Sequence, residues 1–219
     1  MTYKEEAVKR IIFATGNENK MKEIRMILAD CGYEILSMKQ AGIDVDIVED
    51  GKSFEENAVI KAKAIAAVPE AEGAVVLADD SGLEIDCLGG EPGIYSARYM
   101  GEDTSYDLKN RTLIDRVNEA TGMNGSSNDE LEGSGESLGS RSARFVCAIA
   151  AAFPDGHVET VRGTIEGIVG YEQKGENGFG YDPLFYVPEF GCTTAELPPE
   201  RKNEVSHRGN ALRLIREYL

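Results

Sequence analysis

The stretch "VVLADDSGLEID", residues 75–86, joins a short apolar run to two neighbouring carboxylates, Asp79 and Asp80. The apolar part is typical of a buried strand over 74–78, and Gly82 favours a turn after the acidic pair. Two carboxylates at the end of a buried strand are unfavourable unless hydrogen bonds, cations or a metal ion offset their charge. We therefore expect the strand to end either at a functional site or at a capping carboxylate beside a solvated one.

The rest of the chain indicates an α/β fold, because helical and strand patterns alternate early and strands cluster later. Apolar runs predict strands over 10–15, 74–78, 143–153, 158–170 and 183–187. Helical spacing predicts helices over 19–32, 53–67, 104–122 and 209–219, with capping boxes at Ser53–Glu56 and Thr104–Asp107. We expect a mixed β-sheet with flanking helices, the later strands forming a lobe of their own.

Length and composition narrow the class of protein. The 219 residues suffice for one large domain or two small lobes, and a net charge of −16 disfavours a nucleic-acid partner. The four cysteines form no C-x-x-C pair, which argues against a zinc site or a disulfide framework. The first ten residues carry no apolar signal segment, and the longest apolar run, 145–153, is too short to span a bilayer. We expect a cytoplasmic protein without a membrane partner.

Residues 121–142 differ in composition from everything around them. They contain five Gly, six Ser and four acidic residues with few apolar ones. Such a segment buries too little surface to offset its ordering entropy. We predict a low-complexity, mobile surface insertion.

The stretch "ATGNENKMKE", residues 14–23, has the composition of a phosphate-binding turn. Thr15, Gly16 and Asn17 lie between a predicted strand and a predicted helix, and Lys20 falls in the first helical turn. Backbone N–H groups at a helix N-terminus, together with a lysine, favour anions. The Walker A pattern is not met. The alternative is a capped turn with a surface lysine.

A third carboxylate and a second lysine accompany the acidic pair. Glu49 precedes the helix predicted over 53–67, and Lys61 lies two turns along it. Oxygen ligands suit Mg²⁺, which commonly joins a few carboxylates to substrate phosphates. We expect Glu49, Asp79 and Asp80 to hold this metal; the alternative for Glu49 is an ordinary exposed acid.

Two later stretches have the chemistry to bind a planar, oxygen-bearing group. "GENGFGYDP", residues 175–183, combines three glycines with aromatic side chains that either stack on a base or pack in the core. "ERKNEVSHRGNAL", residues 200–212, gathers Lys202, His207 and Arg208 before the last predicted helix, as anion donors or as a solvated helix start. A phosphate turn, a metal cluster, an aromatic shelf and a basic segment together match a nucleoside triphosphate.

These stretches closely resemble the inosine triphosphate pyrophosphatase family, also called the Ham1 or RdgB-like purine nucleotide pyrophosphatases. The matching segments are "ATGNENKMKE", "SFEENAVIKAKA", "ADDSGLEIDCLGGEPGIYSARY", "GENGFGYDPLFYVP" and "KNEVSHRGNAL". They follow the family's order, and the resemblance covers nearly the whole chain except the 121–142 insertion, for which the family usually has a shorter connection. The resemblance implies an elongated fold of the Maf-Ham1 type, with two lobes around an active-site cleft in a homodimer.

The resemblance also implies a reaction: Mg²⁺-dependent hydrolysis of ITP, dITP and XTP to the monophosphate and pyrophosphate. It implies metal ligands at Glu49 and Asp79, and it implies that Asp80 is the catalytic carboxylate that orients or deprotonates the attacking water. It implies substrate contacts at Thr15, Gly16, Asn17, Lys20, Lys61, Ser81, Phe179, Gly180, Tyr181, Asp182, Lys202, His207 and Arg208. Phe179 matches the aromatic that stacks on the base, and Asp182, Lys202, His207 and Arg208 match the groups around its 6-oxo edge.

Three other functions stay open from the residues alone. A pyrophosphatase for modified pyrimidine nucleotides would share the fold but not "SHRG" or "GFGYDP" as they stand here. A nucleotide sensor without turnover would have no need of a water-activating acid, so the Asp79–Asp80 pair and the two lysines argue against it. A nonspecific phosphatase would release phosphate instead of pyrophosphate.

Overall fold

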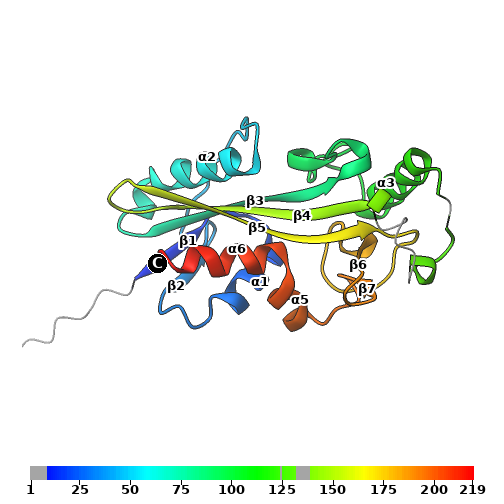
Figure 1. Cartoon of the computed structure of the whole chain (residues 1–219). Coiled ribbons are helices and arrows are strands. Elements are labelled where there is room, and N and C mark those ends of the chain that lie inside the picture. The colour runs from blue at the N-terminus through cyan, green and yellow to red at the C-terminus, as the bar shows by residue number, and fades with distance from the viewer. Residues whose placement is uncertain (1–8, 124, 132–138) are drawn as a thin grey trace, which may run out of the picture. The chain divides into compact units, whose positions relative to one another are not determined.

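The computed structural model describes residues 9–123, 125–131 and 139–219 (Figure 1). Its strands are β1 (Arg10–Phe13), β2 (Glu34–Ser37), β3 (Val75–Ile85), β4 (Ser142–Ala152), β5 (Val158–Val169), β6 (Phe185–Val187) and β7 (Cys192–Thr193). Its α-helices are α1 (Glu18–Ile27), α2 (Phe54–Ala66), α3 (Tyr106–Thr121), α5 (Pro199–Val205) and α6 (His207–Arg216). Among the residues described, no helix is both long and apolar enough to cross a membrane.

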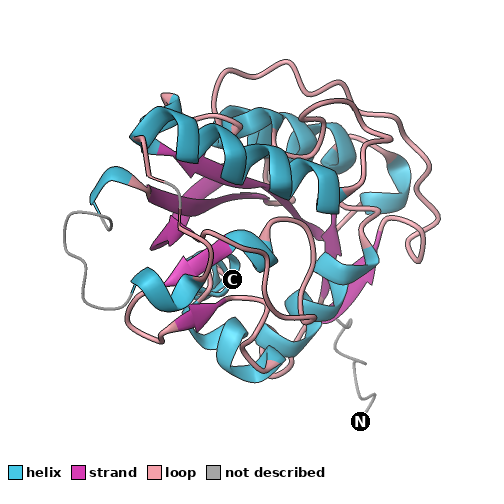
Figure 2. Ribbon diagram, turned by 90° about the vertical axis from the view of Figure 1, so that its right-hand side faces the viewer, coloured by secondary structure: helices cyan, strands magenta, loops and turns pink. Residues whose placement is uncertain are grey.

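The strands belong to one mixed sheet. Hydrogen-bonded neighbours follow the order β2-β1-β3-β4-β5-β6-β7. β1 pairs in parallel with β2 and β3, and β6 pairs antiparallel with β5 and β7. Helices flank the strands in both ribbon views (Figure 2). The predicted α/β class with a mixed sheet and flanking helices is confirmed.

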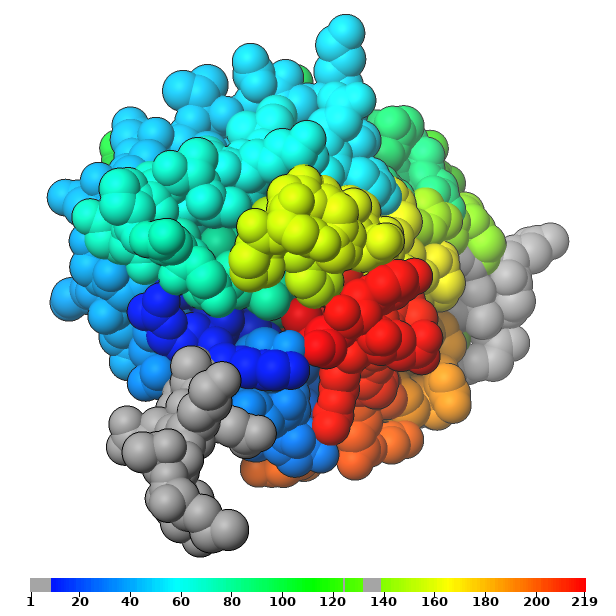
Figure 3. Space-filling view, turned by 90° about the vertical axis from the view of Figure 1, so that its left-hand side faces the viewer, coloured from blue at the N-terminus to red at the C-terminus, as the bar shows by residue number. Residues whose placement is uncertain are grey.

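The chain forms two compact units. The first comprises Met1–Asp80, Ala148–Arg162 and Ala211–Leu219, and the second comprises Ser81–Cys147 and Gly163–Asn210. In the first unit α2 covers one face of β1 and β3 while α1 covers the other (Figure 1). Right-handed crossovers on either side of β1 require this arrangement. Figure 3 looks onto this unit, where the turn between β4 and β5 lies against the segment that follows α2.

The second unit has a core of its own. Leu113 and Val117 of α3 pack with Phe145 of β4 and Phe185 of β6, all of them buried. Apolar residues three to four positions apart on α3 meet alternate residues of the strands, as their periodicities require. At the start of α3, the ring of Tyr106 meets that of Tyr181 edge-on, next to the loop that contains Phe179.

Three predicted boundaries are wrong. β3 continues to Ile85, so Asp79 and Asp80 lie inside a strand and not at its end. Ser105, not Thr104, caps α3, its hydroxyl accepting from the N–H of Leu108. The last helix begins at His207, so the basic segment runs over α5 and into the first turn of α6. The predicted N-cap at Ser53 is confirmed, with its hydroxyl 3.1 Å from the Glu56 nitrogen, while the Glu56 carboxylate accepts from the N–H of Lys52.

The predicted insertion is only partly described. Residues 124 and 132–138 lie outside the described part, so its mobility stays a prediction. The residues beside them are anchored: the 3₁₀ turn Asn128–Leu131 has a buried amide and a buried leucine at its ends. Arg141 is also fully buried and donates to the carbonyls of Val169 and Gly170. Parts of the 121–142 segment are therefore packed into the second unit.

Candidate functional site

The predicted phosphate turn follows β1 and opens α1. Asn17 is the N-cap, and its Oδ1 accepts from the N–H groups of Asn19 and Lys20 at 2.9 and 3.2 Å. The hydroxyl of Thr15 accepts from the N–H of Asn17 at 3.1 Å, which closes the turn. Both polar side chains thus shape the backbone at the positive end of a helix dipole. The turn keeps Lys20 on the side of α1 that faces β3.

Lys20 forms an ion pair with Asp79. Its Nζ lies 3.0 and 2.9 Å from the two carboxylate oxygens of Asp79. The side chain of Asp79 is fully buried and that of Lys20 is 17% exposed. A buried carboxylate needs such a partner because its desolvation is costly. Asp79 therefore belongs to the face of the sheet that α1 covers.

Asp80 meets a different helix. Its Oδ2 accepts from Nδ2 of Asn57 at 3.0 Å, and its Oδ1 lies 3.5 Å from Nζ of Lys61. The same ammonium lies 3.2 Å from Oε2 of Glu49. Asn57 and Lys61 are four residues apart on α2, which places both on the face turned toward β3. Lys61 therefore joins the loop carboxylate to the strand carboxylate.

Burial and charge act in opposite directions in this group. Burial raises the pKa of the Asp80 carboxyl, and the opposing effects of Lys61 and Asn57 do not cancel the rise. Burial also works to lower the pKa of Lys61, but the negative charges of Asp80, Asp79 and Glu49 outweigh it and raise that pKa. Asp80 is thus a carboxylate with an elevated proton affinity beside a permanent cation.

The donor set suits a hard cation without forming a ready-made cage. Within the described ranges, no three His, Cys, Asp or Glu side chains come together closely enough to hold a metal ion. The expected cluster of Glu49, Asp79 and Asp80 is therefore not assembled as such, because Asp79 and Asp80 point to opposite faces of β3. Mg²⁺ binds through one or two carboxylates together with substrate phosphates and water, and these oxygens fit that chemistry. The metal stays a prediction.

The second unit holds the aromatic loop in a buried ion pair. Asp182 is buried; its Oδ2 accepts from Nζ of Lys202 at 2.6 Å and from the N–H of Phe179 at 2.8 Å. The ammonium of Lys202 also lies 5.1 Å from the centre of the Phe179 ring. Gly178 has a φ of +75°, and a Cβ there would lie 2.2 Å from Asp182. These contacts fix the direction in which Phe179 leaves the loop.

The first turn of α6 supplies two further predicted residues. Nη2 of Arg208 donates to the hydroxyl of Ser81 at 3.1 Å, and the guanidinium carbon lies 5.7 Å from the Phe179 ring centre. The ring of His207 stacks on Phe145, with centroids 4.8 Å apart. Arg208, Lys202 and Phe179 thus gather in one cluster of the second unit. Ser81, which follows Asp80 in the chain, belongs to the same cluster.

Tyr181 was expected to contact the substrate, and its surroundings indicate a supporting role instead. Its ring is buried in the core and meets Tyr106 edge-on at 5.2 Å. Its hydroxyl donates to the carbonyl of Ser96 at 2.7 Å. Asp182 likewise uses its second oxygen to accept from the hydroxyl of Thr194 at 2.9 Å. Both residues hold the loop that presents Phe179 and Gly180.

Sequence reasoning missed Asn57. A polar amide in the interior of an Ala-rich helix is unfavourable, because its side chain competes with the backbone for hydrogen bonds. Its spacing of four from Lys61 places the two on one face. The polar residue in an Ala-rich helix and its spacing from Lys61 are the two sequence signals that could have identified Asn57.

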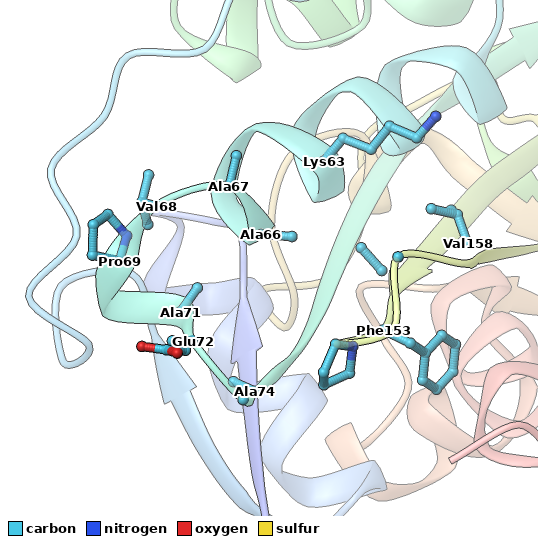
Figure 4. Close-up of a pocket in the computed structure, with 14 residues that line it drawn as sticks. Lys63, Ala66, Ala67, Val68, Pro69, Ala71, Glu72, Ala74, Phe153 and Val158 are labelled. Carbon is cyan, nitrogen blue, oxygen red and sulfur yellow. The ribbon is translucent and has the colours of Figure 1, made fainter.

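The predicted residues do not line the hollow at the end of α2. This hollow has a volume of about 570 Å³ and lies beside the β4–β5 turn (Figure 4). Small apolar side chains, Phe153 and the aliphatic part of Lys63 dominate its lining. It contains none of the carboxylates, aromatic loop residues or basic residues described above.

Comparisons with known proteins give matches over nearly the whole chain. The model of the Ham1 family matches residues 11–218. The chain is 44% identical to the dITP/XTP pyrophosphatase of Desulforamulus reducens, over 96% of this chain and 95% of that protein. It is 46% identical to the dITP/XTP pyrophosphatase of an Exiguobacterium species, over 94% of each.

Solved structures agree with the sequence relatives. The structure of the Staphylococcus aureus Ham1 protein matches with a TM-score of 0.75 at 38% identity, over 96% of this chain and 97% of that one. A HAM1 protein from Coxiella burnetii matches with a TM-score of 0.77 at 34% identity, over 96% and 98%.

Proposed function

Because this chain belongs to the Ham1 family, we propose that it hydrolyses deaminated purine nucleoside triphosphates to the monophosphate and pyrophosphate. ITP, dITP and XTP are the proposed substrates, and the proposed role is removal of these nucleotides from the cellular pool. The dITP/XTP pyrophosphatases at 44% and 46% identity support the substrate class. The observation that carries the proposal is the pairing of each buried carboxylate of β3 with a lysine from a different helix.

The phosphates would meet the lysines of the first unit. Lys20 and Lys61 are cations fixed in place by Asp79, Asp80 and Glu49, so they offer positive charge without first having to be ordered. Charge builds on pyrophosphate as it leaves the α-phosphorus, and both lysines would stabilise it. The backbone N–H groups around Asn17 add the positive end of the α1 dipole.

Asp80 is the residue we assign to the attacking water. A general base works best when its pKa lies near the working pH, and burial raises the pKa of Asp80 in that direction. Asn57 and Lys61 hold its two oxygens, which leaves the carboxylate plane fixed while water approaches. In-line attack on the α-phosphorus would then transfer a proton from water to Asp80.

Glu49 and Asp80, which share the ammonium of Lys61, are the residues that we propose would hold Mg²⁺, whereas Asp79 pairs with Lys20 on the other face of β3. When bound, such a cation would neutralise phosphate oxygens and lower the pKa of a bound water. Chelation followed by readdition of Mg²⁺ tests the requirement: turnover should stop and then recover.

The proposed recognition of the base rests on aromatic and donor side chains. Phe179 offers an aromatic face, which is worth about 1–3 kcal/mol per stacked base. Arg208 and His207 are the proposed donors to the 6-oxo acceptor of hypoxanthine or xanthine. Adenine has an amino donor at this position, so it would leave buried donors unpaired, and sites of this kind reject mismatched groups strongly.

A product analysis tests the proposed reaction. The protein is incubated with Mg²⁺ and ITP, XTP, ATP or GTP, and pyrophosphate is scored against phosphate beside the nucleoside monophosphate. We expect IMP and XMP with pyrophosphate, and far slower turnover of ATP and GTP. Release of phosphate, or equal use of ATP, would contradict the proposal, and bound ITP without turnover would favour a sensor.

We also propose that the protein is a homodimer, as the family resemblance implies. Light scattering coupled to size-exclusion chromatography tests this directly: a monomer mass at the concentrations used for activity would overturn it.

A further inference from the structure

The polar atoms of the Asn57 side chain bond residues of the candidate site, and this amide adds no apolar group to the core. It is fully buried on α2, where the neighbouring buried positions are Phe54, Ala58 and Ala62. Burying a primary amide among such residues is costly unless each of its polar atoms finds a partner. Two partners are present, and they come from different segments of the chain.

The chemistry of these partners fixes the orientation of the amide. The N–H of Gly51 can only donate, so the Asn57 atom 2.9 Å from it must be the carbonyl oxygen. The NH₂ group must then point the other way, where it lies 3.0 Å from Oδ2 of Asp80. Asn57 therefore donates to the carboxylate. A flipped amide would place its NH₂ group against the N–H of Gly51 and its oxygen against the carboxylate of Asp80, and neither pair could form a hydrogen bond.

The loop that contains Glu49 approaches this amide as closely as the backbone allows. A Cβ at Gly51 would lie 2.6 Å from Oδ1 of Asn57 and 2.9 Å from its backbone nitrogen. Only glycine permits this approach without a shift of the loop or the helix. Glu49 precedes Gly51 by two residues and reaches Lys61, one helical turn beyond Asn57.

We infer that Asn57 is a positioning residue for the hydrolytic reaction, one that fixes the Asp80 carboxylate and the 49–51 loop relative to Lys61. The inference rests on the proposed function, since it assigns Asn57 a role through Asp80. Its amide holds one oxygen of Asp80 while Lys61 holds the other, which sets the rotation of the carboxylate. Its carbonyl oxygen accepts from the N–H of Gly51 and so holds the 49–51 loop, in which Glu49 shares the ammonium of Lys61 with Asp80.

Two variants of Asn57 test this role. Asn57→Asp keeps the side-chain volume and the acceptor for Gly51, but sets a carboxylate against Asp80. Asn57→Ala removes both contacts. Because a misplacement of about 1 Å can cost about 100-fold in rate, we expect kcat for ITP to fall by about that factor in each variant. KM should change by less than about threefold, since both polar atoms of the Asn57 side chain already bond Gly51 and Asp80.

A double-mutant cycle separates positioning from simple loss of structure. In the Asp80→Asn background, Asn57→Ala should lower the residual turnover by less than about threefold, because the group through which Asn57 acts is already lost. Asn128 provides the matched control: it is a buried amide in the second unit that bonds the backbone of Tyr171 and Glu172. Asn128→Asp should leave kcat unchanged per folded molecule.

The outcomes are distinguishable. Wild-type kcat in Asn57→Ala, or an equal fold-loss in both backgrounds, would overturn the positioning role while leaving the proposed function intact. Absence of pyrophosphate release from the wild type would overturn the proposed function, and this inference with it. If Asn57→Ala gives no cooperative thermal transition, Asn57→Asp carries the same comparison, with thermal melts reporting the folded fraction.

Discussion

Asp79 and Asp80 are neighbours in β3, yet their carboxylates contact different helices. Asp79 lies 2.9 Å from Lys20 of α1, whereas Asp80 lies 3.0 Å from Asn57 of α2. Successive residues of a strand point to opposite faces, so continuing β3 through this pair separates them. One carboxylate becomes half of a close ion pair, and the other shares a lysine with a loop glutamate. Their substitutions should therefore have different effects.

Asp80→Asn should lower kcat for ITP by several orders of magnitude and at the same time stabilise the protein. The gain arises because burial raises the pKa of Asp80, so its ionised form destabilises the folded state above that pKa. A gain of about 1 kcal/mol would raise the midpoint of thermal unfolding by about 2–4 °C at neutral pH. Calorimetry at pH 7 and enzyme kinetics measure the two effects.

The stability gained by Asp80→Asn should depend on pH in a definite direction. A carboxyl with a raised pKa binds its proton more tightly when folded, so the wild type recovers stability as pH falls through that pKa toward the ordinary value of 3.8. The difference in melting temperature between Asp80→Asn and wild type should therefore shrink on acidification. A difference that widened at low pH would contradict the buried-carboxylate argument.

Lys20→Met should weaken both stability and catalysis. It leaves the fully buried carboxylate of Asp79 without its closest cation, and breaking a buried pair in this way costs about 3–5 kcal/mol, less here because Lys20 is partly exposed. Adding Asp79→Asn to this variant should restore much of the stability without restoring turnover. Urea unfolding of both variants checks the first point, and kcat/KM for ITP checks the second.

Arg141→Met tests whether the anchored end of the 121–142 segment matters to the fold alone. Arg141 donates to the Val169 carbonyl at 2.7 Å, to Asn118 at 2.7 Å and to the Gly170 carbonyl at 2.8 Å, all from a fully buried position. Losing these donors should cost about 3 kcal/mol. Turnover per folded molecule should match the wild type, and a selective loss of kcat would contradict a purely structural role.

The chemistry of the first unit was predictable from residue types, but the strand boundary was not. Lysines and carboxylates close to predicted strand ends and helix starts indicated a charged phosphate site before any distance between them was known. Ser81 and Gly82 favour a turn locally, whereas hydrogen bonding to neighbouring strands keeps this part of β3 extended. Strand propensity is weak beside such tertiary context. Residue types alone therefore could not show that Asp79 and Asp80 contact different helices.

The second unit shows the same limit for aromatic residues. Phe179 and Tyr181 are both aromatic and lie two positions apart in the same glycine-rich stretch. The sequence therefore provided no reason to assign one to the ligand and the other to the core. The distinction comes from Ser96 and Tyr106, which contact Tyr181 from distant segments of the chain. Arg208 was predictable as a donor, but Ser81, which it contacts, is 127 positions away in the sequence, so only the folded chain brings the two together.

Phe179→Leu should raise KM for ITP with little effect on kcat. A leucine keeps an apolar contact but removes the aromatic face, and base stacking is worth about 1–3 kcal/mol, or about 5- to 150-fold in binding. Phe179→Tyr is the matched control, because it keeps the ring and should keep KM within about threefold. Steady-state kinetics on ITP measure both, and a kcat effect larger than the KM effect would contradict a stacking role.

Selectivity should depend on the contact between Arg208 and Ser81. The hydroxyl of Ser81 accepts from Nη2 of the guanidinium at 3.1 Å, which restricts the directions its remaining N–H groups can take. Ser81→Ala removes that restriction but leaves the charge, so we expect the ratio of kcat/KM for ITP over ATP to fall by about tenfold. Arg208→Ala removes the donor itself and should lower the ratio further, since hydrogen-bonding sites discriminate by up to about 10⁴-fold or more. If both variants slowed ITP and ATP equally, Arg208 would act on the shared parts of the nucleotide and not on the 6-oxo edge.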